Sequence, residues 1–268
     1  MKILITGAGG FLGQLLAKNL SHHEIHALTR QQLNLTDSTA VAQHFADSRY
    51  DVVLHCGAAG RNTPTAEDWN IVSSNLASVL NLMTHRQCFH KLINIGTGAE
   101  FDISTDINNV LESEIFNHNP AHSYGLSKNI IARYLTEQPN CFTLRLFGCF
   151  DSSEDHRRLL KKFHSVVASG SRFELQDRNF DMISATDFVT IVDAVLNNTI
   201  QHQNVNCVYA QKHRLSEILS VYCDKHGLDK TLINVSAQGL NYTGNGDILN
   251  QYHLPLQGLE QALTNYEF

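Results

Sequence analysis

The stretch from Ile3 to Gly13, with the sequence ILITGAGGFLG, constrains the fold of this chain more than any other. It reads as an apolar strand, a glycine-rich turn and the start of a helix. Gly7 permits the tight turn, Gly10 lets the backbone approach a pyrophosphate, and Gly13 lets the helix lie close against the strand. The N-terminus of such a helix offers unpaired N–H groups and a positive dipole end to an anion. The pattern therefore predicts a dinucleotide site; the alternative is a purely structural glycine turn.

The length and composition are typical of a globular protein. The chain has 268 residues, 43% of them hydrophobic, and no apolar run approaches the roughly 20 residues of a membrane span. The net charge of -6 argues against a nucleic-acid surface. The largest basic cluster, Arg157-Arg158 with Lys161-Lys162, either meets a phosphate or forms a solvated helix face. The first strand begins at Lys2, which leaves no room for a cleaved signal and predicts a cytoplasmic protein.

Neither the cysteines nor the histidines indicate a special centre. The six cysteines form no C-x-x-C pair and most lie in apolar contexts, so we expect reduced packing residues. The 15 histidines fall in no H-E-x-x-H frame. We therefore expect no metal site.

Strands and helices alternate along the first 150 residues, which predicts a parallel α/β sheet. After the first strand, further strands are expected at residues 24–29, 33–35, 51–55, 91–95 and 141–146. The remainder mixes short strands with helices, and its Gly/Asn-rich stretch at 239–250 is expected to be a loop. We expect a Rossmann-type, doubly wound NAD(P)-binding domain over residues 1–150. A small α+β substrate-binding region, partly interleaved with it, is expected over residues 151–268.

The residues that follow two of these strands suit a nucleotide. Arg30 follows the second strand, with no acid between Ile25 and Thr36. An arginine here accommodates the 2′-phosphate of NADP, whereas an Asp or Glu favours NAD. NADP is therefore the expected cofactor, with NAD as the alternative if Arg30 is only a surface residue. Small residues after the strand at 51–55 let a flat ligand cross the sheet edge.

A hydroxyl and a Tyr/Lys pair supply the candidate chemistry. Thr97 follows the strand at 91–95, and Tyr124 and Lys128 lie four residues apart on one face of a predicted helix. Hydride transfer to or from a carbinol carbon requires a proton to move on its oxygen. A phenol with a pKa of about 10 is poorly suited to this at neutral pH. We expect the Lys128 cation to favour the Tyr124 phenolate.

Together, Thr6-Gly7-x-x-Gly10-x-x-Gly13, Thr97 and Tyr124-x-x-x-Lys128 resemble the short-chain dehydrogenase/reductase superfamily. The resemblance is to its extended branch of nucleotide-sugar epimerases, dehydratases and reductases, and it runs from Met1 to about Ile183. It implies the catalytic set Thr97, Tyr124 and Lys128. It implies the cofactor-binding set Gly7, Gly10, Phe11, Leu12, Gly13, Arg30, Leu35, Gly57, Ala58, Ala59, Asn75, Tyr124 and Lys128.

The resemblance also bears on the substrate and on assembly. It implies a nucleotide-sugar substrate that contacts Thr97 and Tyr124. Arg178, which follows a strand in the second half, either pairs with its diphosphate or is an ordinary exposed arginine. Asn75 matches an asparagine of the superfamily, although a structural role is equally open. Many relatives form dimers through the two helices that hold Asn75 and Tyr124, so a homodimer is a further expectation.

Departures from the family pattern separate the branches. Dehydratases that resemble this chain carry Asp and Glu directly after the threonine, where Gly98 and Ala99 stand here. The GDP-fucose synthase group, which residues 29–37 resemble, carries a cysteine at the position of Ala99. The resemblance therefore favours an NADPH-dependent 4-ketoreductase of a nucleotide-linked deoxysugar. A NAD-dependent 4-epimerase and a non-catalytic NADP-binding redox regulator remain alternatives. Glu100 stands where the family often has valine, which is expected to reshape the substrate pocket.

Overall fold

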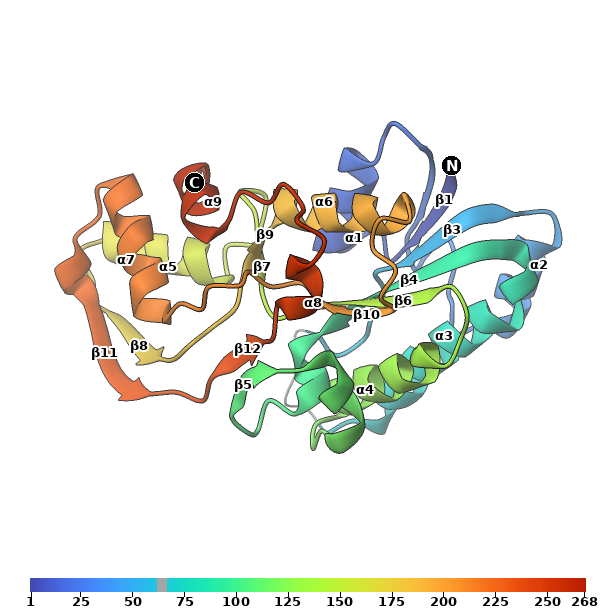
Figure 1. Cartoon of the computed structure of the whole chain (residues 1–268), viewed down its shortest axis with the longest axis horizontal. Helices are drawn as coiled ribbons and strands as arrows, with labels where there is room; N and C mark the ends of the chain where they lie inside the picture. The colour runs from blue at the N-terminus through green and yellow to red at the C-terminus, as the bar shows by residue number, and fades with distance from the viewer. Residues whose placement is uncertain (62–66) are drawn as a thin grey trace.

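The computed structural model describes residues 1–61 and 67–268, and within these residues a six-stranded sheet lies between two layers of helices (Figure 1). The strand order is β10-β6-β4-β3-β1-β2, and every pairing is parallel. The strands are β1 (Lys2–Thr6), β2 (Glu24–Leu28), β3 (Tyr50–His55), β4 (Phe89–Thr97), β6 (Cys141–Leu146) and β10 (Asn204–Asn206). The predicted Rossmann-type sheet is confirmed.

Successive side chains of the strands point to opposite faces of the sheet, and each face has its own helices. Ile3 and Ile5 pack on the face covered by α1 (Phe11–Asn19) and α6 (Ala185–Leu196). Leu4 packs on the opposite face. That face is covered by α2 (Ser38–Ala46), α3 (Trp69–Thr84) and α4 (Ser123–Thr136), and Figure 1 shows the two layers above and below the sheet. The near-continuous apolar strands of the sequence follow from burial on both faces.

The strand expected at residues 33–35 is wrong. These residues form a turn, in which the Leu33 N–H donates to the backbone oxygen of Thr29 at 2.9 Å. Leu33 and Leu35 are nevertheless buried, and the Asn81 side chain donates to the backbone oxygen of Leu35 at 2.8 Å. Their period-2 pattern arises because two leucines enter the core from a turn, not because they alternate along a strand.

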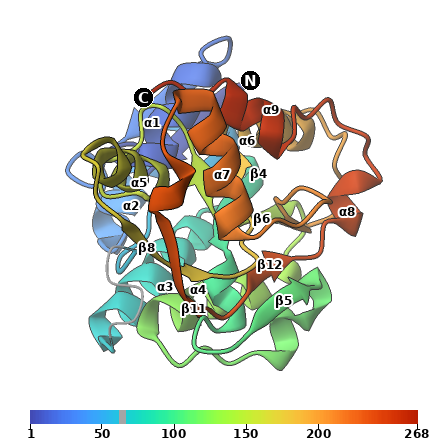
Figure 2. The same ribbon diagram turned by 90° about the vertical axis from the view of Figure 1, so that its left-hand side faces the viewer.

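The second half of the chain forms a smaller cluster at the other end of the molecule, seen end-on in Figure 2. Its helices α5 (Leu159–Ala168), α7 (Leu215–His226) and α9 (Leu259–Thr264) pack around the paired strands β8 (Phe173–Asp177) and β11 (Ile233–Gln238). The short elements β7 (Cys149–Phe150) and β9 (Ile183–Ser184) pair with each other. β10 of the large sheet also comes from this half, and the domain division at residue 150 stays a prediction.

The loop expected at 239–250 is wrong in part. It contains β12 (Tyr242–Gly244) and the single-turn helix α8 (Asp247–Asn250). β12 pairs with β5 (Ile107–Val110), which belongs to the first half of the chain. A segment rich in glycine and asparagine therefore joins the two halves, because backbone hydrogen bonds hold it where local propensity predicts a loop.

Two further findings concern the cysteines and the helices. All six cysteines lie among the described residues, and they are free, five of them buried, as expected of packing residues. None of the helices in the described ranges combines the length and the hydropathy needed to cross a bilayer.

Candidate active site

Two glycines of the turn between β1 and α1 leave no room for a side chain. Gly7 has a φ of 72°, and a Cβ there would lie 2.5 Å from the backbone nitrogen of Gly57. A Cβ on Gly13 would lie 2.4 Å from the backbone oxygen of Gly7. Gly10 is the N-cap of α1, and among the described residues no side chain caps this helix. Its first N–H groups are therefore available to an anion, as the sequence pattern predicts.

One cavity of about 940 Å³ runs along the carboxyl ends of the strands, from this turn to the end of β4. Its size suits a cofactor together with a substrate group. Most of the expected site residues line it: Gly7, Gly10, Leu12, Arg30, Leu35, Gly57, Ala58, Ala59, Asn75, Thr97, Tyr124 and Arg178. Phe11, Gly13 and Lys128 are not part of the described lining. Phe11 and Gly13 belong to α1 behind the turn, and Lys128 lies beneath the cavity floor.

The described lining of the cavity carries four arginines and no carboxylate. Arg30, Arg61, Arg158 and Arg178 come from four separate segments of the chain. Guanidinium groups are the preferred partners of phosphates, and a cleft lined by charges of one sign attracts the opposite charge. The cavity therefore suits a polyanion with several phosphates.

Two of these arginines come from the second half of the chain. Arg158 donates to Glu154 Oε2 at 2.8 Å, and its guanidinium lies 5.0 Å from the ring of Phe11 at the start of α1. Arg178 directly follows β8, and its guanidinium lies 5.4 Å from the ring of Phe180. Arg178 Nε is buried without a hydrogen-bond partner among the described residues. A buried donor without a partner is costly, so a ligand acceptor at this place is favourable.

Thr97, Tyr124 and Lys128 meet where β4 ends and α4 begins. Tyr124 and Lys128 are 8% and 2% exposed. Lys128 Nζ donates to the backbone oxygen of Ile95 at 2.8 Å and to Asn94 Oδ1 at 3.3 Å. The lysine is thus bound to the strand beneath Thr97, while the tyrosine faces the cavity.

Burial decides the proton affinity of Tyr124. Burial raises the pKa of Tyr124, while the positive charge of Arg61 and the Thr97 hydroxyl lower it by less. Burial also lowers the pKa of Lys128, against the raising effect of Glu100. The expected lowering of the Tyr124 pKa is therefore not found, because desolvation outweighs the nearby cations. Tyr124 holds its proton at neutral pH and is a donor.

The comparison with known proteins decides the family. Residues 3–208 match the model of the NAD dependent epimerase/dehydratase family. The chain belongs to this family. The resemblance to extended short-chain dehydrogenases/reductases that the motifs indicated is thereby confirmed.

Three proteins that cover most of this epimerase/dehydratase family member are similar to it at low sequence identity. GDP-L-colitose synthase from Yersinia pseudotuberculosis is 21% identical, over 87% of this chain and 84% of its own. The structure of a dTDP-4-dehydrorhamnose reductase from Clostridium acetobutylicum has a TM-score of 0.83 at 19% identity, covering 99% of this chain and 98% of the other. GDP-mannoheptose C4 reductase from Campylobacter jejuni, with NADP bound, has a TM-score of 0.78 at 17% identity, covering 98% and 96%.

Asn75 has a clear structural role in this family member. Its Oδ1 accepts from the Ala59 N–H at 2.7 Å, and its Nδ2 donates to Ser127 Oγ at 2.8 Å. The side chain therefore ties the small-residue loop after β3 to helix α4. This tie places Ala59 against the cavity, and Asn75 acts on the site through the loop that it holds.

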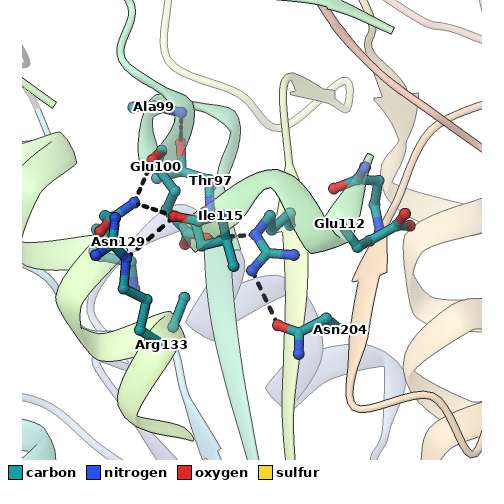
Figure 3. Close-up of polar contacts among 12 residues, drawn as sticks. Thr97, Ala99, Glu100, Glu112, Ile115, Asn129, Arg133 and Asn204 are labelled. Atoms are coloured by element: carbon teal, nitrogen blue, oxygen red, sulfur yellow. Dashed lines mark hydrogen bonds and ion pairs between the residues drawn. The ribbon is translucent and has the colours of Figure 1, made fainter. Parts of the chain in front are cut away.

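A buried ion pair between Glu100 and Arg145 lies next to Thr97 (Figure 3). Glu100 is fully buried; its Oε1 accepts from the Thr97 N–H at 3.0 Å and its Oε2 accepts from Arg145 Nε at 2.5 Å. Arg145 in turn donates to Asn204 Oδ1 at 2.9 Å, and the Asn129 side chain donates to the Glu100 backbone oxygen at 2.8 Å. Glu100 therefore holds the backbone of Thr97 and is not part of the described cavity lining, so the expectation that it reshapes the substrate pocket is wrong.

Arg61, Arg158 and Tyr242 line the cavity although they were not expected in the site from the sequence. Arg158 had a signal in the basic cluster around it, and of that cluster it alone belongs to the described cavity lining. Arg61 and Tyr242 had no signal in the sequence, because both lie in segments that were expected to be loops. Their approach to the cavity depends on contacts with residues far away in the chain.

Three side chains of metal-ligand type come together elsewhere. His22, His23 and Asp193 each bring one donor atom to within 4.8 Å of the others. His22 is exposed, and none of the three belongs to the described cavity lining. We therefore assign these three side chains no part in the chemistry of the cavity.

Proposed function

We propose that this protein reduces the 4-keto group of a nucleotide-linked 4-keto-6-deoxysugar, with NADPH as the hydride donor and Tyr124 as the proton donor. Bound NADPH would supply the hydride to the carbonyl carbon. Tyr124 donates its proton to the carbonyl oxygen, so that the ketone becomes an alcohol and NADP⁺ is released. Thr97 hydrogen-bonds the same oxygen and orients it.

The residues of the cavity fit such a cofactor. Gly7 and Gly13 leave no room for a Cβ, which keeps the turn tight, and the first N–H groups of α1 are free to bind a pyrophosphate. Lys128 is bound to the strand below Thr97 and in the family's role holds the nicotinamide ribose. Hydride chemistry of this kind requires no metal.

The observation that carries the proposal is a buried, protonated phenol beside a hydroxyl at one end of a cavity lined by arginines. Reduction of a ketone consumes a proton, which a phenol beside the reacting oxygen supplies. A 4-epimerase uses the same phenol first as a base and then as an acid, with tightly held NAD in place of NADPH. Arg30 in the cavity lining, which suits the 2′-phosphate of NADPH, therefore supports reduction over epimerisation.

The substrate end of the cavity suits a nucleoside diphosphate. Arg178 lines the cavity from the second half of the chain, and its buried Nε has no acceptor among the described residues, whereas Arg158 lies beside Phe11 at the glycine-turn end. The relatives named above act on GDP-linked or dTDP-linked sugars by their names, which supports a nucleotide-linked substrate. We propose that the Arg178 guanidinium group binds its diphosphate.

The experiment that tests the proposal is a titration with NADPH and NADH, followed by single-turnover oxidation of bound NADPH with a panel of nucleotide 4-keto-6-deoxysugars. Tighter binding of NADPH, and its consumption by one ketosugar, are the expected results. Co-purifying NAD with no response to ketosugars would overturn the reductase in favour of the 4-epimerase. Binding without any turnover would overturn it in favour of the redox regulator.

Arg30→Ala is expected to raise the dissociation constant of NADPH about 10–100-fold and to leave that of NADH nearly unchanged, because a charge-assisted bond to the 2′-phosphate is lost. Arg30 is exposed and lines the cavity, as do Asn34 and Thr36. Fluorescence titration measures both constants. Arg172→Ala, at an exposed arginine that is not part of the described lining, is the matched control. Equal weakening of both cofactors would contradict this role.

A homodimer is also proposed. α3 and α4 pack on each other and carry exposed apolar side chains, with Leu80 49% and Ile130 38% exposed. Trp69 at the start of α3 is 75% exposed. Large apolar side chains exposed on two neighbouring helices favour a second copy as their cover.

A further inference from the structure

A second phenol lies beside Thr97. Tyr242 belongs to β12, the strand that brings the second half of the chain against β5 (Figure 1). Tyr242 Oη lies 3.5 Å from Thr97 Oγ1, and the residue lines the cavity. The ring centroid of Tyr242 lies 5.1 Å from that of Phe147 and 5.6 Å from that of Phe180. Two aromatic neighbours therefore hold the ring with its hydroxyl at the reacting end of the cavity.

The same ring explains the glycine after Thr97. A Cβ on Gly98 would lie 2.8 Å from Tyr242 Cζ and 2.4 Å from Phe147 Cδ1. The space beside Thr97 that an acidic side chain at position 98 would need is thus filled by these two rings. Tyr242 takes the place next to the threonine that the dehydratases give to an acid.

The hydrogen bonds of Thr97 then determine where its proton points. A hydroxyl offers one proton and two acceptor sites. Thr97 Oγ1 accepts from the Ala99 N–H at 3.3 Å, which occupies one acceptor site. Burial raises the pKa of Tyr242 far above its ordinary value, so this phenol keeps its proton and can donate at any physiological pH. A bond from Tyr242 to Thr97 occupies the second acceptor site.

We infer that Tyr242 is a positioning residue for the reduction: it donates to Thr97 Oγ1 and so commits the proton of Thr97 to the substrate's carbonyl oxygen. The inference rests on the proposed function. With both acceptor sites of Thr97 filled, its proton is left for the two groups on the cavity side, the Tyr124 hydroxyl and the substrate's carbonyl oxygen. The second half of the chain thereby completes the reacting centre that the first half carries.

Tyr242→Phe isolates the hydroxyl, because phenylalanine keeps the ring between Phe147 and Phe180. We expect kcat for the ketosugar to fall about tenfold, with KM changed less than about twofold and NADPH binding unchanged. Tyr222→Phe is the matched control, since it removes a buried phenol hydroxyl that bonds His164 Nδ1 at 3.0 Å in the core of the second half. It is expected to leave kcat unchanged. Unchanged kcat in Tyr242→Phe would overturn the inference.

A double-mutant cycle distinguishes action through Thr97 from a structural effect. If Tyr242 acts through Thr97, adding Tyr242→Phe to Thr97→Val lowers kcat no further. If the two effects multiply, Tyr242 acts independently of Thr97 and the inference is overturned.

A measurement without turnover separates this inference from the proposed function. Tyrosinate absorbance reports the titration of Tyr124 when each protein is compared with its Tyr124→Phe form. Because the Thr97 hydroxyl lowers the pKa of Tyr124, a misdirected Thr97 proton is expected to raise that pKa in Tyr242→Phe. Equal titration midpoints of Tyr124 in the wild type and in Tyr242→Phe would overturn the inference. A wild type that reduces no ketosugar would overturn only the proposed function.

Discussion

Tyr124→Phe is expected to lower the rate of ketone reduction by about 10²–10⁴-fold while leaving the dissociation constant of NADPH unchanged. The substitution removes the proton donor and keeps the ring, which is 8% exposed and packs with Ile71 and Ala99. Single-turnover oxidation of bound NADPH by the ketosugar measures the rate of the chemical step, and fluorescence titration measures cofactor binding.

The control for this variant lies on the same helix. Tyr134→Phe removes a phenol hydroxyl from α4 at a partly buried position that is not part of the described cavity lining, and it is expected to keep the full rate. A Tyr124→Phe protein that retains normal turnover would exclude Tyr124 as the proton donor. The loss of turnover with intact binding would also argue against a protein that only binds NADP, because such a protein has no chemical step to lose.

Arg145→Met is expected to lower the free energy of unfolding by about 3–5 kcal/mol, because it leaves the Glu100 carboxylate buried without its partner. Both side chains of this pair are fully buried, so neither charge can be rescued by solvent. Urea denaturation followed by circular dichroism measures the change. Arg157→Met, in an exposed pair with Asp155, is expected to change stability little.

The double variant Glu100→Leu/Arg145→Met separates stability from catalysis. Removing both charges is expected to restore most of the lost stability, since a buried pair replaced by apolar groups is often neutral. Turnover of the double variant is expected to be lower than that of the wild type, because the Thr97 N–H loses its 3.0 Å hydrogen bond to Glu100 Oε1. A double variant no more stable than Arg145→Met would show that the unpaired charge is not the cause of the loss.

The features that the sequence predicted correctly are local ones. The glycine spacing of residues 7–13 needs only a few consecutive residues to be interpreted, and the structure confirms the tight approach of Gly13 to Gly7. The alternation of apolar strands and amphipathic helices predicted the parallel sheet for the same reason. The spacing of Tyr124 and Lys128 placed both on one helix, whereas the direction of the lysine toward Ile95 depended on the strand beneath it.

The errors arose where a local pattern had two physical origins. Leu33 and Leu35 have the alternation of a strand, but they are buried from a turn. The Lys128 cation was expected to lower the pKa of Tyr124, but burial, which only packing determines, raises it. In both cases the sequence identified the residues but could not show how deeply, or from which kind of segment, they are buried.

By itself, the sequence determined the glycine turn, the layered sheet and the placing of Tyr124 and Lys128 on one helix, because each depends on spacing within a short part of the chain. Only the tertiary structure brought Arg61, Arg158 and Arg178 to one cavity and Tyr242 to Thr97. It also paired Glu100 with Arg145 across 45 positions of the chain. Such contacts have no local signature, since they arise only when the chain buries its apolar faces and leaves distant polar groups to satisfy one another.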